Sequence, residues 1–303
     1  MNISFIIPVL NSEKFIRQCL QGVLSEASEG DEVIVVDNGS TDDTVKIIRS
    51  FDRVQLLIYP DITVSALRNR GASSSSNSLL AFIDADVILC ENWRKQVAKI
   101  FTDKHIHASG SRYDLPEDAC WIERAWYAQK KIEKCKAKYI NSGNLIVRAG
   151  VYETLGGFDE KLASDEDCDF GKRLNKKGYL MMEVPDIRTV HLGNPKSLKA
   201  FYRKELWHAT SVLASKSFEI FNRPTIMSIL FGITLLVSFT CLAASLLVSV
   251  SFIWGVLSVL LIPIITAMYR AYQFNMYRYV PELTLLWAIF YSARIKNILK
   301  YPF

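Results

Sequence analysis

The chain lacks the closely spaced cysteines that a structural zinc site or a small disulfide scaffold requires. No Cys-x-x-Cys pair occurs in its 303 residues, and the six cysteines lie far apart: Cys19, Cys90, Cys120, Cys135, Cys168 and Cys241. Small disulfide-held domains concentrate their cysteines much more strongly. The cysteine pattern therefore argues against both kinds of protein and suits a reducing compartment.

Charged side chains are absent from residues 224–269, a run of 46 residues that also has no histidine. At a rise of about 1.5 Å per residue, about 20 residues cross the hydrocarbon core of a bilayer. The run is therefore long enough for two membrane spans, about Ile226–Val248 and Phe252–Tyr269, joined by a tight turn. A helical hairpin buried in a protein core is the alternative.

Basic residues flank this uncharged run on both sides. Residues 196–223 have six Lys or Arg and two acidic residues, and residues 270–303 have five and one, so each flank carries +4. Because the whole chain carries +5, residues 1–195 carry −3. A net acidic region disfavours nucleic acid, and basic flanks favour anionic membrane lipids on the cytoplasmic side. The sequence predicts a multi-pass membrane protein with its main domain and C-terminus in the cytoplasm, and no nucleic-acid partner.

Four regions follow from these patterns. They are a main domain at 1–195, an amphipathic interfacial helix at 196–223, a transmembrane hairpin at 224–269 and a basic cytoplasmic tail at 270–303. The tail contains Leu283–Ala293, an apolar segment too short to cross a bilayer. We expect that segment to form an interfacial or re-entrant helix.

Short β-branched runs alternate with helical patterns in the main domain. The expected strands are Ser4–Leu10, Glu32–Val36, Val54–Tyr59 and Leu80–Ile83, and the expected helices include Glu13–Leu24 and Ala66–Leu79. Ser73–Ser76 are poor helix formers inside the last of these. The alternation predicts an α/β domain with a doubly wound, mostly parallel, Rossmann-like sheet, which binds ligands at the carboxyl ends of its strands.

Acidic residues follow two of these strands. Asp37 ends the second strand, where its carboxylate can accept a hydrogen bond from a nucleobase or a ribose hydroxyl; a glycine turn that caps the next helix is the alternative. Asp84 and Asp86 follow the fourth strand, and alternation along a strand places them on the same side. Two carboxylates there need a cation or hydrogen bonds, and Mg²⁺ or Mn²⁺ bridging a diphosphate satisfies this need.

A third acidic cluster begins a predicted helix at Ser164–Phe170. Its four acids in five residues stabilise a helix N-terminus by charge alone. Helical spacing lets Arg173 neutralise the face that Glu166 and Asp169 share, and it leaves Asp167 directed elsewhere. A carboxylate placed in that way can take a proton from a hydroxyl nucleophile.

Six strings, in a fixed order within about residues 3–193, carry a resemblance to a known family. They are IIPVLN, VDNGSTDDT, ALRNRG, FIDADV, NSGNLIVR with LGGFDE, and SDEDCDFGKRL. In this order and spacing the chain resembles the family 2 glycosyltransferases with the GT-A fold. The resemblance implies an inverting, metal-dependent enzyme of the hexosyltransferase type, with a nucleotide sugar as donor and Mn²⁺ or Mg²⁺ as the metal.

The resemblance also implies which residues bind the donor. Pro8 and Asp37 would line the pocket for the base and the ribose, and Arg68 would approach the nucleotide. Asp84 would bind the ribose or the metal. These four positions are therefore the expected nucleotide-sugar site.

The remaining implied roles concern the metal and the chemistry. Asp86 would ligate the metal, with Asp84 beside it, and Asp167 would be the catalytic base. His191, in the string VHLG, matches the position of a histidine that contacts the metal or the diphosphate; a core histidine is the alternative. Ser111–Lys138 is the expected segment for sugar specificity.

We expect the enzyme to add single sugars to a hydroxyl of a lipid-linked or surface-glycan acceptor of the cell envelope, at the cytoplasmic membrane face. Asp167 favours a hydroxyl acceptor, because a polyprenyl phosphate is already ionised and needs no base. A polyprenyl-phosphate glycosyltransferase and a catalytically inactive membrane scaffold with the same fold are the alternatives. Trp121, Trp126 and Tyr127 can stack on a sugar ring, or can pack in a core.

Overall fold

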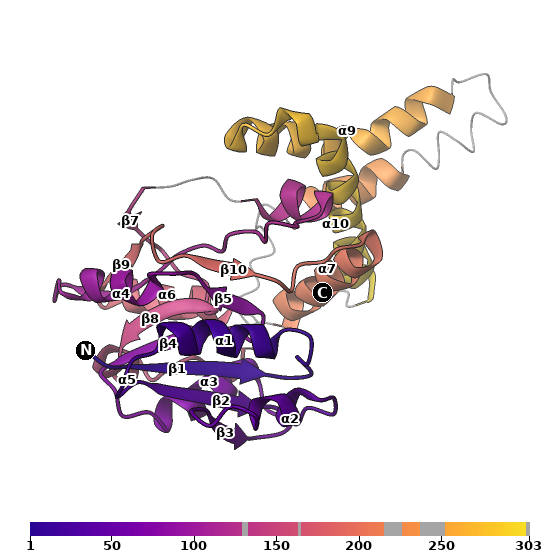
Figure 1. Ribbon diagram of the computed structural model, residues 1–303. Helices are drawn as coiled ribbons and strands as arrows, with labels where there is room; N and C mark the ends of the chain where they lie inside the picture. The colour runs from indigo at the N-terminus through magenta and orange to yellow at the C-terminus, as the bar shows by residue number, and fades with distance from the viewer. Residues whose placement is uncertain (129–132, 163–164, 215–225, 237–251, 301–303) are drawn as a thin grey trace. The chain divides into compact units, whose positions relative to one another are not determined.

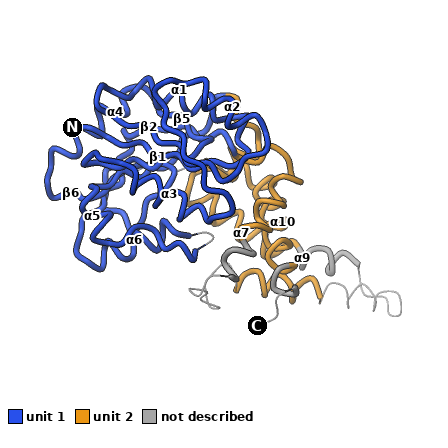
Figure 2. The backbone as a smooth tube through the Cα atoms, turned by 90° about the horizontal axis from the view of Figure 1, so that it is seen from below, with its two compact units in different colours: residues 1–117, 129–193 blue, residues 118–128, 194–303 orange. Residues whose placement is uncertain are grey.

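The chain forms two compact units in the computed structural model. The described residues are 1–128, 133–162, 165–214, 226–236 and 252–300. Unit 1 comprises residues 1–117 and 129–193, and unit 2 comprises residues 118–128 and 194–303 (Figure 2).

A mixed eight-stranded sheet forms the centre of unit 1, with the strand order β3-β2-β1-β4-β8-β6-β9-β7 (Figure 1). Its strands are β1 (Ile3–Val9), β2 (Glu32–Asp37), β3 (Gln55–Ile58), β4 (Leu79–Ile83), β6 (Ile106–Gly110), β7 (Cys135–Lys136), β8 (Asn144–Arg148) and β9 (Leu180–Glu183). Strands β3, β2, β1 and β4 are parallel, whereas β8 runs antiparallel to both β4 and β6. The α/β architecture is as predicted, and the far half of the sheet makes it mixed.

Apolar residues cover both faces of this sheet. The helices of unit 1 are α1 (Ile16–Glu26), α2 (Thr44–Ile48), α3 (Val64–Ser73), α4 (Trp93–Phe101), α5 (Ala149–Thr154) and α6 (Glu166–Lys176). Along β1, Phe5 belongs to one hydrophobic cluster and Ile6 to the cluster that contains Phe82. Because both faces are buried, the strand has a nearly continuous apolar sequence, with Ser4 as its polar residue, instead of an alternating one.

Helix α3 ends earlier than the sequence predicts. It stops at Ser73, and β4 begins at Leu79. The hydroxyl of Ser74 donates to the carbonyl of Arg70 (3.1 Å), and that of Ser75 donates to the carbonyl of Ala72 (2.7 Å). Serine hydroxyls that take helix carbonyls in this way compete with the backbone ladder and favour a helix end.

A separate two-stranded antiparallel sheet joins the last residues of unit 1 to the segment that follows β4. It pairs β5 (Val87–Leu89) with β10 (Thr189–His191), and His191 lies opposite Val87. The pairing therefore places His191 beside the residues that follow β4.

Unit 2 is helical in its described residues. Its elements are the π-helix η1 (Glu123–Tyr127), α7 (Leu198–Ala214), the helical residues 226–236, α9 (Phe252–Phe274), the 3₁₀ helix η2 (Tyr277–Tyr279) and α10 (Val280–Lys300). Phe201, Ala267, Ala271, Leu283 and Leu286 are fully buried in one cluster. Helices α7, α9 and α10 thus share a hydrophobic core.

The predicted transmembrane hairpin is wrong. Within the ranges that the structure describes, no helix is both long enough and apolar enough to cross a membrane. This finding also overturns the predicted multi-pass membrane localisation. Residues 237–248 of the first predicted span lie outside the described residues.

The physical reason is that a hydrophobic core between packed helices excludes charged side chains, as the interior of a bilayer does. On α9, Ala267 and Ala271 are buried against Leu283 and Leu286 of α10, so part of the uncharged run is an interior surface. The buried-hairpin alternative describes this part better. The segment Leu283–Ala293 lies within α10 and contributes to the same core.

Candidate active site

Asp37 closes the turn that follows β2. It is 1% exposed, and its carboxylate accepts from the backbone N–H of Gly39 (2.8 Å) and of Ser40 (2.9 Å) and from the Ser40 hydroxyl (2.5 Å). Gly39 has a φ of +83°, a backbone conformation that favours glycine. Pro8 is buried on β1 and pairs with Val36. Asp37 therefore shapes the loop that a nucleotide would meet at this edge of the sheet.

Arg68 of α3 joins two carboxylates from distant parts of the chain. Its Nη2 lies 2.6 Å from Asp84 Oδ1, and its Nη1 lies 2.8 Å from Glu166 Oε1. Arg68 is 3% exposed. Burial alone disfavours the charged guanidinium, but the charges of Asp84 and Glu166 outweigh it and raise the pKa of Arg68. The guanidinium expected to approach the nucleotide is thus occupied in holding Asp84 and Glu166.

Tyr113 stands beside Asp84, and the sequence-based reasoning missed it. Its hydroxyl donates to Asn141 Oδ1. Burial, followed by the charges of Asp84 and Asp86, raises the pKa of Tyr113 far above its usual range, so the phenol remains a neutral donor. A Cβ on Gly143 would come within 2.2 Å of Asp84 Oδ2 and 2.3 Å of the Tyr113 hydroxyl. The glycine in the string NSGN was the signal for this close approach.

Asp86 and His191 form the second pair in this region. Asp86 Oδ2 lies 3.4 Å from His191 Nε2, with the side chains 27% and 13% exposed. The His191 ring lies 5.0 Å from that of Tyr113. A Cβ on Gly193 would fall 1.8 Å from Asp86 Oδ2, so only glycine admits this carboxylate. The ribbon of β5 and β10 makes the pairing possible.

A metal would need help from the substrate at this place. In the part of the chain that the structure describes, no group of three or more His, Cys, Asp or Glu is arranged to hold an ion. Asp84 already pairs with Arg68. The adjacent Asp86 carboxylate and His191 imidazole are therefore the oxygen and nitrogen donors that a metal ion could bind here. Mg²⁺ in phosphate-transferring sites is held by about one or two carboxylates together with substrate phosphates. The pair therefore fits a metal that a diphosphate also ligates.

Asp167 lies in the first turn of α6, after Asp165, whose φ of +61° sets the turn into the helix. Its Oδ1 accepts from the N–H of Cys168 (2.7 Å). Burial, and then the charge of Glu166, raise the pKa of Asp167 to about 6, although the Cys168 N–H and Arg68 oppose the shift. The charge of Asp167 also raises the pKa of Tyr113. Asp84, Asp86 and Asp167 all contribute to the raised pKa of Tyr113, and Glu166, the neighbour of Asp167, is joined to Asp84 through Arg68.

The other acids of α6 divide between two arginines. Arg173 pairs with Asp169 at 2.7 Å, as the helical spacing predicted. Glu166 instead accepts from Arg68 and from the Ser142 hydroxyl (2.9 Å).

Asp37 is more distant from the other acidic site residues. Strand β1 separates its strand from β4, which corresponds to about 10 Å across the sheet. The structure therefore pairs Asp86 with His191, links Asp167 to Asp84 through Glu166 and Arg68, and leaves Asp37 at the same edge two strands away.

A cavity of about 500 Å³ adjoins this group. It is lined by Ser111–Tyr113, Cys135–Asn141 and Glu183, and so shares Tyr113 and Asn141 with the site. Of these two residues, Tyr113 lies near Asp84, so the cavity borders the carboxylate group through Tyr113.

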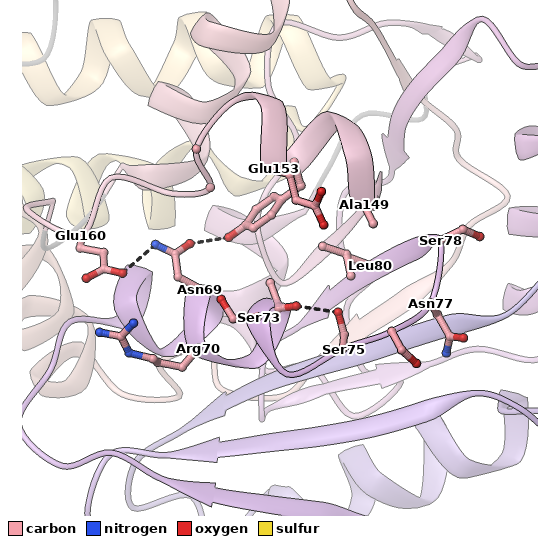
Figure 3. Close-up of a pocket in the computed structure, with 15 residues that line it drawn as sticks. Asn69, Arg70, Ser73, Ser75, Asn77, Ser78, Leu80, Ala149, Glu153 and Glu160 are labelled. Atoms are coloured by element: carbon pink, nitrogen blue, oxygen red, sulfur yellow. Dashed lines mark hydrogen bonds between the residues drawn. The ribbon is translucent and has the colours of Figure 1, made fainter.

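A second cavity, of about 560 Å³, lies near the opposite end of β4 (Figure 3). Ser73, Ser75–Ser78, Glu153 and Glu160 are among its lining residues. Asn69 donates to Glu160 (3.0 Å) and accepts from the Tyr152 hydroxyl (2.5 Å). None of the predicted site residues lines this cavity.

The aromatic residues predicted to stack on a sugar belong to unit 2. Trp126 lies 4.7 Å from the ring of Trp287 and 5.0 Å from that of Phe201, so it follows the core-packing alternative. Lys204 lies over the Tyr127 ring at 5.0 Å. Trp121 is 41% exposed.

Comparison with known proteins identifies the kind of chain this is. The model of "Glycosyl transferase family 2" matches residues 4–156, and that of "Glycosyl transferase family group 2" matches residues 140–292. Glycosyltransferase AglE of Haloferax volcanii is 32% identical over 205 residues, which are 64% of this chain and 67% of AglE. The O-antigen chain rhamnosyltransferase RfbN of Salmonella typhimurium is 23% identical over 238 residues, covering 72% of this chain and 76% of RfbN. Two further curated relatives are covered over only 13% and 26% of their length.

Solved structures agree on the fold. The mannosyltransferase PcManGT from Pyrobaculum calidifontis, in complex with GDP-Man and Mn²⁺, superposes with a TM-score of 0.59 at 16% identity, covering 98% of this chain and 87% of that one. At this identity the likeness establishes the fold alone.

Proposed function

Because the chain belongs to glycosyl transferase family 2, and is thus a glycosyltransferase that uses a nucleotide sugar, we propose that it inverts the anomeric centre and glycosylates a hydroxyl group. The acceptor we propose is a lipid-linked or surface glycan. The similarity to an O-antigen rhamnosyltransferase supports that class of acceptor.

In the proposed reaction the acceptor hydroxyl oxygen forms a bond to the anomeric carbon of the donor sugar. The bond from that carbon to the diphosphate oxygen breaks, and its electron pair leaves with the nucleoside diphosphate. The hydroxyl proton passes to a carboxylate oxygen of Asp167. The products are the inverted glycoside and the nucleoside diphosphate.

Asp86 and His191 are the residues we propose to hold a divalent metal, with Mn²⁺ or Mg²⁺ as candidates. When bound, such an ion supplies positive charge that stabilises the leaving diphosphate. Asp84 lies between Arg68 and the backbone of Gly143, a placement suited to a ribose hydroxyl. Pro8 and Asp37 would border the base and ribose at the same sheet edge. Arg68 acts as a positioning residue, because its guanidinium is enclosed by carboxylates.

The observation that carries this proposal is the place of Asp167, in the first turn of α6 and next to Glu166, which Arg68 joins to Asp84. The Asp167 pKa of about 6 leaves it mainly ionised at neutral pH, yet makes it a stronger base than an ordinary aspartate. A hydroxyl nucleophile needs such a base, whereas a polyprenyl phosphate does not. The link from Asp167, through Glu166 and Arg68, to Asp84 supports the hydroxyl acceptor over the polyprenyl-phosphate and inactive-scaffold alternatives.

The test replaces Asp167 by Asn and follows release of nucleoside diphosphate from a panel of nucleotide sugars with hydroxyl acceptors. We expect kcat to fall about 10²- to 10⁴-fold, while the thermal shift caused by donor and Mn²⁺ persists. Asp169→Asn is the matched control, because it lies on the same helix and pairs with Arg173. Undiminished turnover by Asp167→Asn would contradict the proposal.

A further inference from the structure

The cavity beside the catalytic group is basic within a net acidic region. Arg112, Lys136 and Lys138 line it, and Glu183 is the acidic residue of its lining. Glu183 Oε1 accepts from Arg112 Nε at 2.8 Å, which neutralises one of the three cations. Among the described residues, neither Lys136 nor Lys138 forms an ion pair. Two positive charges in the cavity wall are therefore left for a ligand.

The two lysines lie at and just beyond the end of strand β7. Strand β7 pairs antiparallel with β9, with Lys136 opposite Met182, and the N–H of Ala137 donates to the carbonyl of Met181 (2.9 Å). Lys136 and Lys138 are exposed, whereas Ala137 between them is buried. Both lysines line the same cavity, so both positive charges border the space that a ligand would occupy.

The same segment packs on the helix of the proposed base. The carbonyl oxygen of Lys138 would lie 2.6 Å from a Cβ on Gly171, and it accepts from Asn175 Nδ2 at 2.9 Å. Gly171 is one turn after Asp167 on α6. The absence of a side chain at Gly171 thus brings the basic cavity wall against the helix that carries Asp167.

We propose that this cavity binds a phosphate ester group of the acceptor, and thereby presents the acceptor hydroxyl to Asp167. A phosphate monoester carries a charge of about −1.5 to −2 at neutral pH, which the two unpaired lysines balance. The ammonium of lysine is a point-charge donor that suits phosphate oxygens. The inference rests on the proposed function, and it adds that the acceptor is anionic at a group other than its nucleophile. The donor diphosphate is assigned to Asp86 and His191, outside this cavity.

The experiment measures binding of hexyl phosphate to the full chain by titration calorimetry, with hexyl glucoside as the neutral probe. For Lys136→Gln/Lys138→Gln we expect about a tenfold or greater loss of affinity for hexyl phosphate and no change for hexyl glucoside. Lys134→Gln is the matched control, since Lys134 lies in the same exposed segment but does not line the cavity, and its effect should stay within about twofold. An equal loss in both variants would overturn the proposal.

Two further measurements distinguish phosphate binding in the cavity from donor binding and from binding to a lipid surface. Nucleotide-sugar binding with Mn²⁺ should be the same in the double variant and the wild type; if the wild type binds no donor, the proposed function fails while the hexyl phosphate result still decides the cavity. Sedimentation with phosphatidylcholine vesicles, with and without phosphatidylglycerol, tests lipid headgroups as the source of phosphate. If the double variant loses binding to phosphatidylglycerol vesicles but keeps its affinity for hexyl phosphate, the lysines contact a lipid surface. That result would overturn the assignment of the cavity to the acceptor.

Discussion

Two cavities of unit 1 have similar volumes, about 500 and 560 Å³, but different linings. One adjoins the carboxylates that follow β4 and is bordered by Arg112, Lys136 and Lys138. The other, at the amino end of β4, is lined mainly by serines, asparagines and glycines, together with Arg70, Glu153 and Glu160. Its polar groups largely find partners in their own neighbourhood, such as Ser75 on the Ala72 carbonyl and Asn69 on Glu160.

This difference shows where the chain has accepted an electrostatic cost. At the carboxyl end of β4, the buried Arg68 forms an ion pair with both Asp84 and Glu166. Buried charges that depend on one another are weak evidence for stability alone, and perturbed groups concentrate at functional sites. The serine-lined cavity has no comparable arrangement, so substitutions there should have small effects.

The largest expected effect comes from removing the buried cation of the site. Arg68→Met leaves Asp84 and Glu166 without their shared partner, and we expect a loss of about 3–5 kcal/mol in the free energy of unfolding. Denaturant titration measures this loss. Arg70→Met is the control from the other cavity; Arg70 lies 6.0 Å from the Tyr59 ring centre, and its loss should cost under about 1 kcal/mol. If both variants lost the same free energy of unfolding, the buried ion pairs at the carboxyl end of β4 would be no more important for stability than the groups at its amino end.

A pH profile gives the next largest effect. Because the pKa of Asp167 is raised to about 6, kcat/KM should fall about tenfold per pH unit below pH 6 as the base becomes protonated. Asp167→Asn should flatten this limb. A profile that stays level down to pH 5 would show that Asp167 is not the base.

The same shift has a consequence for stability. The folded protein binds the Asp167 proton more tightly than the unfolded chain, so this group favours the folded state below its ordinary pKa and loses that contribution as the pH rises through about 6. Asp167→Asn should therefore raise Tm relative to wild type at pH 8, and the difference should narrow toward pH 4. A Tm difference independent of pH would contradict this origin.

The smallest effect is expected in the serine-lined cavity. Ser75→Ala removes one hydroxyl bond, to the Ala72 carbonyl at the end of α3, and should change the free energy of unfolding by about 0.5 kcal/mol or less. The value of kcat should remain unchanged in the glycosyltransferase assay. A large loss of activity would mean that this cavity serves the reaction and that the comparison between the two ends is wrong.

Much of the α/β unit could be predicted from local pattern. The strands around Phe5, Val35 and Phe82 are apolar and bounded by polar turns, and the structure has strands at all three. The spacing of Asp169 and Arg173 also predicted their ion pair, since residues four apart meet on a helix. Such contacts depend only on neighbours along the chain.

The partners of the site could not be predicted in this way. Tyr113, Asn141 and Glu166 come together with Arg68 and Asp84 only after strands from both halves of the sheet are paired. Their sequence separations are large, and no periodicity connects them. The uncharged run at 224–269 was misread for a related reason: the sequence records that charge is excluded, but not whether lipid or protein excludes it.

By itself the sequence determined the α/β layering of unit 1, the glycosyltransferase motifs and the identity of the acidic residues, because these depend on short-range pattern. Tertiary structure alone decided that Arg68 holds Asp84 and Glu166, that glycines at 143, 171 and 193 admit close neighbours, and that lysines line a cavity whose wall packs on the helix of Asp167. The physical reason is that charge and steric exclusion act over a few ångströms in space, whatever the distance along the chain.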